Sequence, residues 1–91
     1  MASKYMTASA AIGSSGDNNQ AHRIFITGDQ AVNTIGTVSL KQGGSGGTDV
    51  WKAYMDGGGC GQFSIPNIVF DYVTISNVEI CLEYYKQHGK A

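Results

Sequence analysis

Apolar and polar residues alternate along several short segments of this chain, with the period of two that is typical of β-strands. The clearest case is the segment 78–84, in which the even-numbered positions are apolar and the odd-numbered positions are Glu79, Cys81 and Glu83. This alternation predicts a strand with one buried face and one solvent-facing face. No window repeats apolar residues at intervals of three and four, as an amphipathic helix requires. We therefore expect an all-β protein.

Further segments of strand-like composition are separated by turn residues, chiefly glycine, asparagine and aspartate. The predicted strands span residues 4–12, 22–27, 36–41, 50–55, 62–65, 72–76 and 78–84. The glycine runs 43–47 and 57–59 predict turns, because glycine adopts positive φ angles without steric cost. Asn77 is the single residue between the last two predicted strands, and we expect it to join them in a C-terminal hairpin.

This density of strands predicts a compact antiparallel β-sandwich or jelly roll of about seven to eight short strands, in which two sheets bury their inner faces against each other. A chain of 91 residues has room for one domain. We expect an N-terminal arm or first strand at 1–20, the β-sandwich domain at 21–86 and a C-terminal tail at 87–91.

The expected core consists of the apolar residues on the inward face of each predicted strand. These are Ile24, Ile26, Val38, Leu40, Trp51, Ala53, Phe63, Ile65, Phe70, Val73, Ile75, Val78, Ile80 and Leu82. A core of this size leaves a short chain only marginally stable as a monomer. The strand 50–55 is partly apolar on both faces, so it is either central to the sandwich or in contact with another subunit.

Composition narrows the possible partners. The chain has 6 Lys plus Arg against 7 Asp plus Glu, a net charge of −1. It therefore lacks the excess of basic residues that is typical of nucleic-acid-binding proteins. Its apolar runs are too short for a membrane-spanning helix. The first residues lack the apolar stretch of a secretory signal, so we expect synthesis in a cytosol. Cys60 and Cys81 permit one disulfide, although free thiols are the expectation in a reducing compartment.

The motifs of common catalytic and cofactor sites are incomplete in this sequence. The loop 43–48 lacks the lysine of a phosphate-binding loop, and the run 57–61 precedes a predicted strand where a dinucleotide-binding motif has a helix. His22 and His88 are too far apart to form a local metal pair. Glu79 and Glu83 flank Cys81, whereas a reactive cysteine needs an electropositive setting. We expect no enzymatic activity, no cofactor and no metal.

Carboxylates alone do not change this expectation. The acidic residues Asp49, Asp56, Asp71, Glu79 and Glu83 could include the acid and base of a glycosidase, but such a number on loops and strand faces is expected by chance. The run 17–19 resembles the start of a calcium loop and lacks the residues that complete one.

Aromatic residues are the strongest candidates for a contact surface, since such side chains are enriched at binding interfaces. The candidate protein-contact residues are Tyr5, Trp51, Tyr54, Tyr72 and Tyr85. Each of them has an alternative interpretation as an ordinary packing residue of the core or of a sheet edge. Tyr84 and Tyr85 point to opposite faces of the last strand, which places Tyr85 outside the core.

The C-terminal third of the chain, from Phe63 to Tyr85, resembles a pattern common among small virion proteins of tailed phages. An apolar-Pro-x-Ile stretch is followed by a segment containing Phe70, then by Tyr-Val-Thr-Ile-Ser at 72–76, a turn, and a final strand ending in tyrosine. The segments 24–27 and 36–41 resemble the middle strands of these proteins. Cys60, Cys81 and the glycine run 57–59 lie outside the pattern.

The resemblance implies a structural protein of the virion, above all a capsid decoration or cement protein that binds and stabilises the assembled head. Its partners would be the major capsid protein or other virion proteins, with a trimer as the favoured homo-oligomer and assembly in the host cytoplasm. Two alternatives remain open. One is a head-fibre, tail or adaptor component of the virion, and the other is a carbohydrate-binding β-sandwich module that uses Trp51 and exposed tyrosines.

Overall fold

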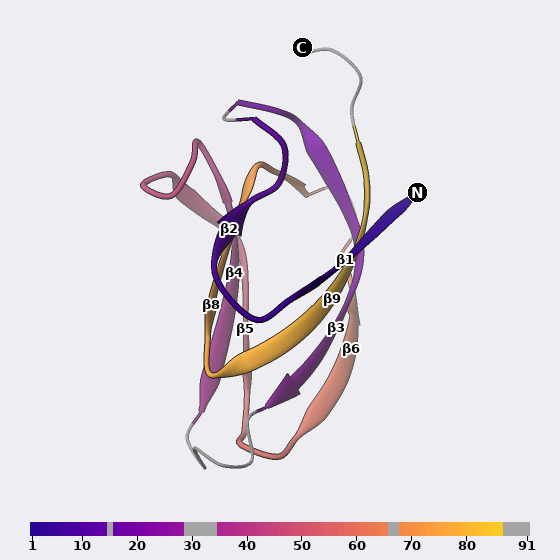
Figure 1. The fold of residues 1–91 in the computed structure, drawn as a ribbon, viewed down its shortest axis with the longest axis vertical. Helices are drawn as coiled ribbons and strands as arrows, with labels where there is room; N and C mark the ends of the chain where they lie inside the picture. The colour runs from indigo at the N-terminus through magenta and orange to yellow at the C-terminus, as the bar shows by residue number, and fades with distance from the viewer. Residues whose placement is uncertain (15, 29–34, 66–67, 87–91) are drawn as a thin grey trace.

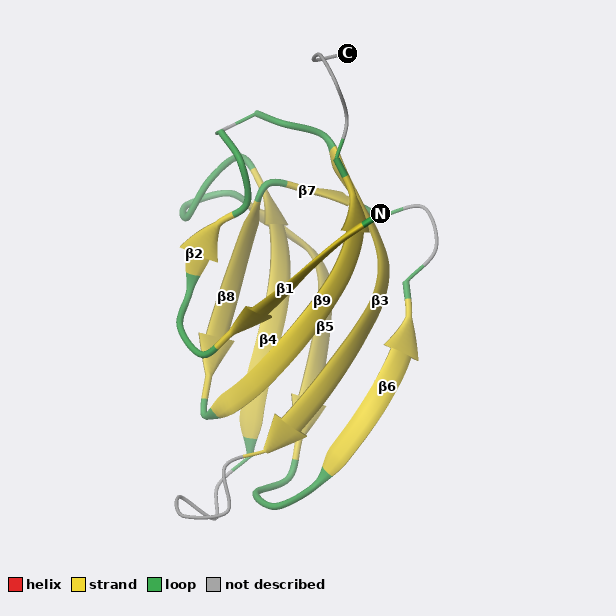
Figure 2. Cartoon of the chain, turned by 45° about the vertical axis from the view of Figure 1, so that its right-hand side comes forward, coloured by secondary structure: helices red, strands yellow, loops and turns green. Residues whose placement is uncertain are grey.

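Two antiparallel β-sheets face each other and enclose one core (Figures 1 and 2). The computed structural model describes residues 1–14, 16–28, 35–65 and 68–86, and these ranges contain strands, turns and loops but no helix. The prediction of an all-β sandwich is confirmed, with nine short strands where about seven to eight were expected. The expected tail at 87–91, including His88, lies outside the described residues.

The first sheet, sheet A, has the strand order β1-β9-β3-β6. The short strand β7 also pairs with β3, on the same side of β3 as β6. Its strands are β1 (Ala2–Met6), β3 (Asn19–Gly28), β6 (Cys60–Ser64), β7 (Val69–Phe70) and β9 (Val78–Tyr85). The central strands β3 and β9 are the longest in this sheet, so most of its backbone ladder lies between them.

The second sheet, sheet B, has the strand order β2-β8-β4-β5. Its strands are β2 (Ala10–Ala11), β4 (Gly36–Gln42), β5 (Thr48–Met55) and β8 (Tyr72–Ser76). The single strand expected at 4–12 is therefore two strands, one in each sheet. The chain crosses between the sheets at residues 7–9, where the Ser9 hydroxyl accepts a hydrogen bond of 2.9 Å from the backbone N–H of Ile75.

The two sheets have matching strand orders: at each position, the strand of one sheet is adjacent in sequence to the strand at the same position of the other. The edge strand β1 corresponds to β2, β9 to β8, β3 to β4, and β6 to β5. The β4–β5 connection is a hairpin within sheet B, whereas β5 leads into β6 in the other sheet. Strands that are neighbours in sequence thus lie mostly in opposite layers, and most of the neighbours within a layer are distant in sequence.

The predicted C-terminal hairpin at Asn77 is wrong. The strand β8 belongs to sheet B and β9 to sheet A, so Asn77 carries the chain from one sheet to the other. Hairpins use loops of at least two residues, and one residue between two strands cannot reverse the chain within a sheet. Asn77 has φ 59°, a left-handed conformation that asparagine tolerates better than most residues.

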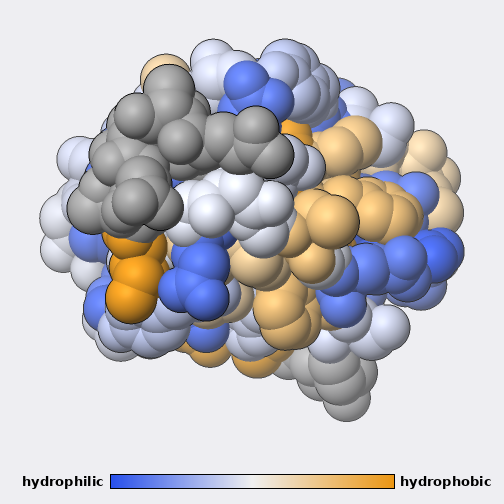
Figure 3. Space-filling model, turned by 90° about the horizontal axis from the view of Figure 1, so that it is seen from below, coloured by the Kyte–Doolittle hydropathy of each residue, from blue (hydrophilic) through white to orange (hydrophobic). Residues whose placement is uncertain are grey.

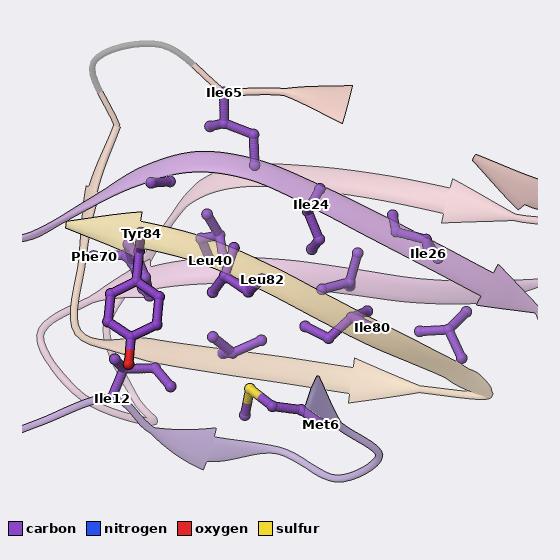
Figure 4. Packing of buried hydrophobic residues seen from close by; sticks show 14 residues of the cluster. Met6, Ile12, Ile24, Ile26, Leu40, Ile65, Phe70, Ile80, Leu82 and Tyr84 are labelled. Atoms are coloured by element: carbon purple, nitrogen blue, oxygen red, sulfur yellow. The ribbon is translucent and has the colours of Figure 1, made fainter. Parts of the chain in front are cut away.

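The core lies between the sheets, where side chains from both layers interdigitate (Figure 4). The fully buried residues include Ile24, Ile26, Leu40, Phe70 and Leu82, all of which were predicted. Three other predicted core residues, Trp51, Ala53 and Ile75, are only partly buried, and Phe63 is exposed. Trp51, Ala53 and Phe63 lie on the edge strands β5 and β6. The buried apolar residues that the prediction omitted are Met6, Ile12, Ala21 and Tyr84.

The end of the sandwich that contains β2 and the β4–β5 loop is held by a buried carboxylate. Asp71 is 1% exposed, and its two oxygens accept hydrogen bonds from the backbone N–H groups of Gly16 (2.8 Å), Gly43 (3.1 Å) and Gly44 (2.9 Å). We call these four residues the Asp71 cluster. It ties two glycine-rich loops to the residue that joins β7 to β8.

The environment of Asp71 affects its ionisation in two opposing ways. Burial raises the pKa of its carboxyl group, whereas the N–H groups of Gly16, Gly44 and Gly43 lower it by stabilising the charged form. The hydrogen bonds prevail, so the pKa lies below the ordinary value of 3.8. Asp71 is therefore a carboxylate at neutral pH and a structural residue, with both oxygens already engaged.

Candidate functional site

The outward face of sheet A carries a row of side chains that crosses four strands. Tyr5 on β1 lies opposite Cys81 on β9, Cys81 lies opposite Phe25 on β3, and Phe25 lies opposite Gln62 on β6. Residues that are opposite each other in an antiparallel pair point to the same face. Tyr5 is 64% exposed and Phe25 is 37% exposed. We call Tyr5, Phe25 and Tyr85 the aromatic face; Tyr85 lies four residues beyond Cys81 on β9 and points to the same side of the sheet.

A charged pair lies beside this row and orients one of its rings. The Arg23 Nε donates a hydrogen bond of 3.0 Å to the Glu83 carboxylate, and these two residues are directly opposite in the β3–β9 register. The same guanidinium lies 5.6 Å from the centre of the Phe25 ring, within the range of a cation–π interaction. The planar guanidinium of Arg23 therefore lies over the Phe25 ring of the aromatic face.

Tyr5 is held from the other side by an acidic residue of β9. Its hydroxyl donates a hydrogen bond to the Glu79 carboxylate, and this bond is the main reason that the pKa of Tyr5 is raised above 10.0. Glu79 precedes Cys81 by two residues on β9 and so points to the same face. Tyr5 and Glu79 therefore lie on the same outward face of sheet A.

Tyr85 extends the aromatic face at the end of β9. Its ring makes an edge-to-face contact with His22, with centroids 5.7 Å apart. His22 is the extra residue of a β-bulge in β3, between Ala21 and Arg23, and such bulges redirect side chains. A shallow hollow beside Tyr85 is lined by Met1, Ala2 and Lys86.

The outward face of sheet B has a different character. Tyr54 on β5 is 62% exposed and lies opposite Thr37, which in turn lies opposite Ser76. Tyr72 is partly buried on the same face, opposite Lys41. Hydroxyl groups and charges dominate this surface, and Tyr54 is its most exposed ring among the described residues.

Trp51 does not lie on either outward face. It is opposite the fully buried Leu40 and so points between the sheets, where its ring makes an edge-to-face contact with Phe63 of β6 at 5.9 Å. The side chain of Met55 packs against Gly61 on the same side of the sandwich. These residues close the gap between the edge strands β5 and β6. Figure 3, seen from the end where β5 leads into β6, shows apolar surface on this side of the molecule.

The predicted contact residues therefore fall into three places. Tyr5 and Tyr85 lie on the outward face of sheet A, Tyr54 and Tyr72 on that of sheet B, and Trp51 at the open side between them. The prediction did not include Phe25, Arg23 and Glu83, which connect the aromatic face. Their alternation with Ile24, Ile26 and Leu82 was the available signal, because residues that alternate with core positions must point outward.

The reactive side chains are dispersed. Cys60 and Cys81 are both free, and they lie on β6 and β9 with β3 between them. Among the described residues, no group of three or more histidine, cysteine, aspartate or glutamate side chains is close enough to hold a metal ion. Asp49 faces Lys41 and Lys52 on sheet B at 3.8 and 3.5 Å, whereas Glu79 and Glu83 lie on sheet A.

No helix within the described ranges has the length and apolarity needed to cross a membrane. Comparisons of this chain with protein-family models, with curated proteins and with solved structures find no match. The interpretation of the surface therefore depends on its chemistry and geometry.

Proposed function

We propose that this chain is a structural protein of a tailed-phage virion, a capsid decoration protein that binds the assembled head through the aromatic face of sheet A. The observation that carries the proposal is the surface formed by Tyr5, Phe25 and Tyr85 with the Arg23–Glu83 pair. Tyrosine and arginine are enriched among the residues that dominate binding energy at protein interfaces. The Arg23–Glu83 hydrogen bond and the contact of Arg23 with the Phe25 ring pre-order these side chains, which reduces the entropy lost on binding.

The resemblance of residues 63–85 to small virion proteins supports the choice of partner. This stretch supplies β7, β8 and β9 and therefore contributes strands to both sheets. The low charge of the chain, 14% of residues, also suits a protein whose surface is covered by neighbouring subunits, since charged residues are depleted at the centre of interfaces.

Binding to particles is the direct test. Purified particles of the phage that encodes the chain are analysed by quantitative mass spectrometry, and a decoration protein is present in a copy number tied to the lattice of the head. Absence from the particles contradicts the proposal. A few copies per particle contradict the decoration role and favour a head-fibre, tail or adaptor component.

A matched pair of variants tests the surface. Recombinant protein is added to particles that lack it, and the bound fraction is measured by co-sedimentation. The double change of Tyr5→Ala and Phe25→Ala is expected to weaken binding at least about tenfold, the effect of losing a dominant interface contact. Tyr54→Ala removes a side chain of similar exposure, 62% against 64%, from the opposite face and is expected to have no effect. Equal loss in both variants would contradict the assignment of the face.

A second candidate function, carbohydrate binding, is favoured by the outward face of sheet B. An exposed ring at Tyr54 beside the hydroxyls of Thr37 and Ser76 provides a stacking surface with neighbouring hydrogen-bonding groups. A glycan array with wild-type protein, Tyr54→Ala and Trp51→Ala separates the two candidates. Binding that requires Tyr54 supports this candidate, and absence of binding across the array eliminates it.

A further inference from the structure

The two sheets have edges that differ in how they are protected against pairing with another chain. Natural edge strands carry charges, bulges or inward-pointing lysines, or are very short. On sheet A, β1 has Lys4 opposite the buried Leu82, and β7 has only two residues. On sheet B, β2 also has two residues, and β5 has Asp49, Lys52 and a bulge in its pairing with β4.

The strand β6 has none of these features. Its sequence is CGQFS, without charge or proline, and its pairing with β3 is regular from Cys60 to Ser64. Within the described part of the chain β6 pairs with β3 alone, and all of its residues except Gly61 are exposed. No other strand among the described residues covers this edge.

The hydrogen bonds to β3 show which backbone groups of β6 are free. The carbonyl of Gly59 accepts from Gly28 at 2.8 Å, and the N–H of Ile65 donates to His22 at 2.9 Å. Residues of an antiparallel strand alternate between facing one neighbour and facing the other. Gly61 and Phe63 therefore bond to β3, whereas Cys60, Gln62 and Ser64 direct their N–H and C=O groups away from it.

We propose that β6 pairs with β6 of a second copy of this chain, antiparallel about a two-fold axis at Gln62. In this register Gln62 lies opposite its own copy and Cys60 lies opposite Ser64 of the second copy. Each opposed pair exchanges two backbone hydrogen bonds, so every free donor and acceptor of the edge is satisfied. The same register is self-complementary, as a two-fold interface requires.

The side chains of β6 fit this register. Phe63 is 36% exposed on the side of β6 that faces the core, and in the dimer it lies opposite Gly61 of the second copy. An aromatic ring across from a glycine on a neighbouring strand covers the backbone that the glycine leaves bare. On the outward face, the row from Tyr5 through Cys81 and Phe25 to Gln62 continues into the same row of the second copy. The dimer thus doubles the aromatic face into one surface.

The first experiment measures mass in solution with the purified chain alone, so its result does not depend on the virion role. Sedimentation equilibrium is expected to give a dimer of twice 9.6 kDa. Gln62→Pro removes the N–H that each copy donates at the axis and is expected to raise the dissociation constant at least about tenfold. Proline is tolerated where the N–H of an edge strand faces solvent, and circular dichroism verifies that the monomer folds.

Charge changes provide a matched control. Gln62→Lys places like charges opposite each other at the axis and is expected to weaken the dimer about fivefold. Ser3→Lys makes the same change on β1, the opposite edge of sheet A, and is expected to leave the dimer unchanged. Mixing Gln62→Lys with Gln62→Glu is expected to restore association. A dimer that Gln62→Lys and Ser3→Lys affect equally would contradict the proposal.

Disulfide trapping tests the register. In a background of Cys60→Ser and Cys81→Ser, Gln62→Cys is expected to cross-link two copies when oxidised glutathione is added, because cysteines opposite each other in a strand pair meet the distance limits of a disulfide. Ser64→Cys in that background is expected to remain monomeric in a denaturing gel, and with native Cys60 retained it is expected to cross-link. A wild-type monomer at all concentrations, a trimer, or cross-linking by Ser64→Cys alone would overturn the proposal.

Discussion

Backbone N–H groups from two different loops converge on the buried carboxylate of Asp71. A second buried polar side chain, Asn19, assists at the same end of the molecule, where its Nδ2 donates to the carbonyls of Ile12 (2.8 Å) and Phe70 (3.2 Å). Loops rich in glycine lose much entropy on folding, so they need specific partners. The Asp71 cluster supplies such partners for loops that contain few apolar side chains of their own.

Replacement of Asp71 by asparagine is the first prediction. The amide retains the shape but presents one donor to N–H groups that require an acceptor, so we expect a loss of about 1–3 kcal/mol in the free energy of unfolding. Urea unfolding at pH 7, followed by Trp51 fluorescence, measures it. Asp49→Asn is the control, because its contacts with Lys41 and Lys52 are on the surface and contribute less than about 1 kcal/mol.

Acid is expected to remove the contribution of Asp71. The folded-state pKa lies below the ordinary 3.8, so the unfolded chain takes up the proton more readily than the folded chain. The stabilisation is therefore complete above about pH 4 and declines as pH falls through the folded-state pKa. Urea midpoints measured from pH 7 to pH 2 should converge for wild type and Asp71→Asn at the acidic end. A constant difference over this range would contradict the prediction.

At the scale of elements, the turn between β8 and β9 depends on two residues that are distant in sequence. Asn77 adopts φ 59°, and a Cβ atom placed on Gly36 would lie 2.6 Å from the carbonyl oxygen of Asn77 and 2.8 Å from that of Ser76. The start of β4 therefore approaches this turn so closely that a side chain at Gly36 would displace it. Glycine there is a requirement of packing between elements.

Substitutions at Asn77 should separate conformational strain from packing. Asn77→Val places a β-branched residue in the left-handed region and is expected to destabilise the fold by about 1–3 kcal/mol, whereas Asn77→Gly should be tolerated within about 1 kcal/mol. Chemical denaturation of both variants provides the comparison. Equal destabilisation would mean that the asparagine side chain, rather than φ, determines the effect.

The strands were predictable because alternation depends only on the residues of one segment. The segments 22–27, 36–41, 72–76 and 78–84 all lie within observed strands. Sheet membership was not predictable in this way, since it depends on which strands meet across the whole chain. The hairpin prediction at Asn77 assumed that strands adjacent in sequence pair with each other. Instead, β8 and β9 lie in different sheets and pack their inner faces against the same core.

The contact surface was only partly predictable for the same reason. Composition identifies Tyr5 and Tyr85 as candidates, but not the β1–β9–β3 register that places Tyr5 and Phe25 on either side of Cys81. Trp51 belongs to an edge strand whose inner face is only partly covered, and no local pattern distinguishes that position from a central one. Asp71 gave a local signal, a single charge within the apolar run 68–73.

At the scale of the whole molecule, the crossing connections couple the two layers. Because most consecutive strands lie in opposite sheets, neither sheet consists of one continuous stretch of chain. If one sheet unfolds, most strands of the other sheet therefore lose the folded strand to which the chain connects them. We expect the sandwich to unfold in a single cooperative step.

Mutations in the two layers test this cooperativity. Ile80→Val removes a methylene from sheet A and Ile12→Val removes one beside sheet B, and both positions are at most 2% exposed. Each is expected to cost about 1 kcal/mol and to shift the same transition, seen alike by Trp51 fluorescence and far-ultraviolet circular dichroism. Transitions that separate between the two probes would show that the sheets unfold independently.

The pairing of β1 with β9 determines when the chain can reach its native state during synthesis. Ala2 pairs with Tyr84 and Met6 with Ile80, so β1 finds its partner only after β9, which is synthesised much later, has left the ribosome. At ordinary elongation speeds the wait lasts on the order of several seconds. During this time Met6 has no core to enter, and β3 has no ladder on its β9 side. Folding is therefore expected to follow release of β9, which makes the unfinished chain a natural substrate for ribosome-associated chaperones.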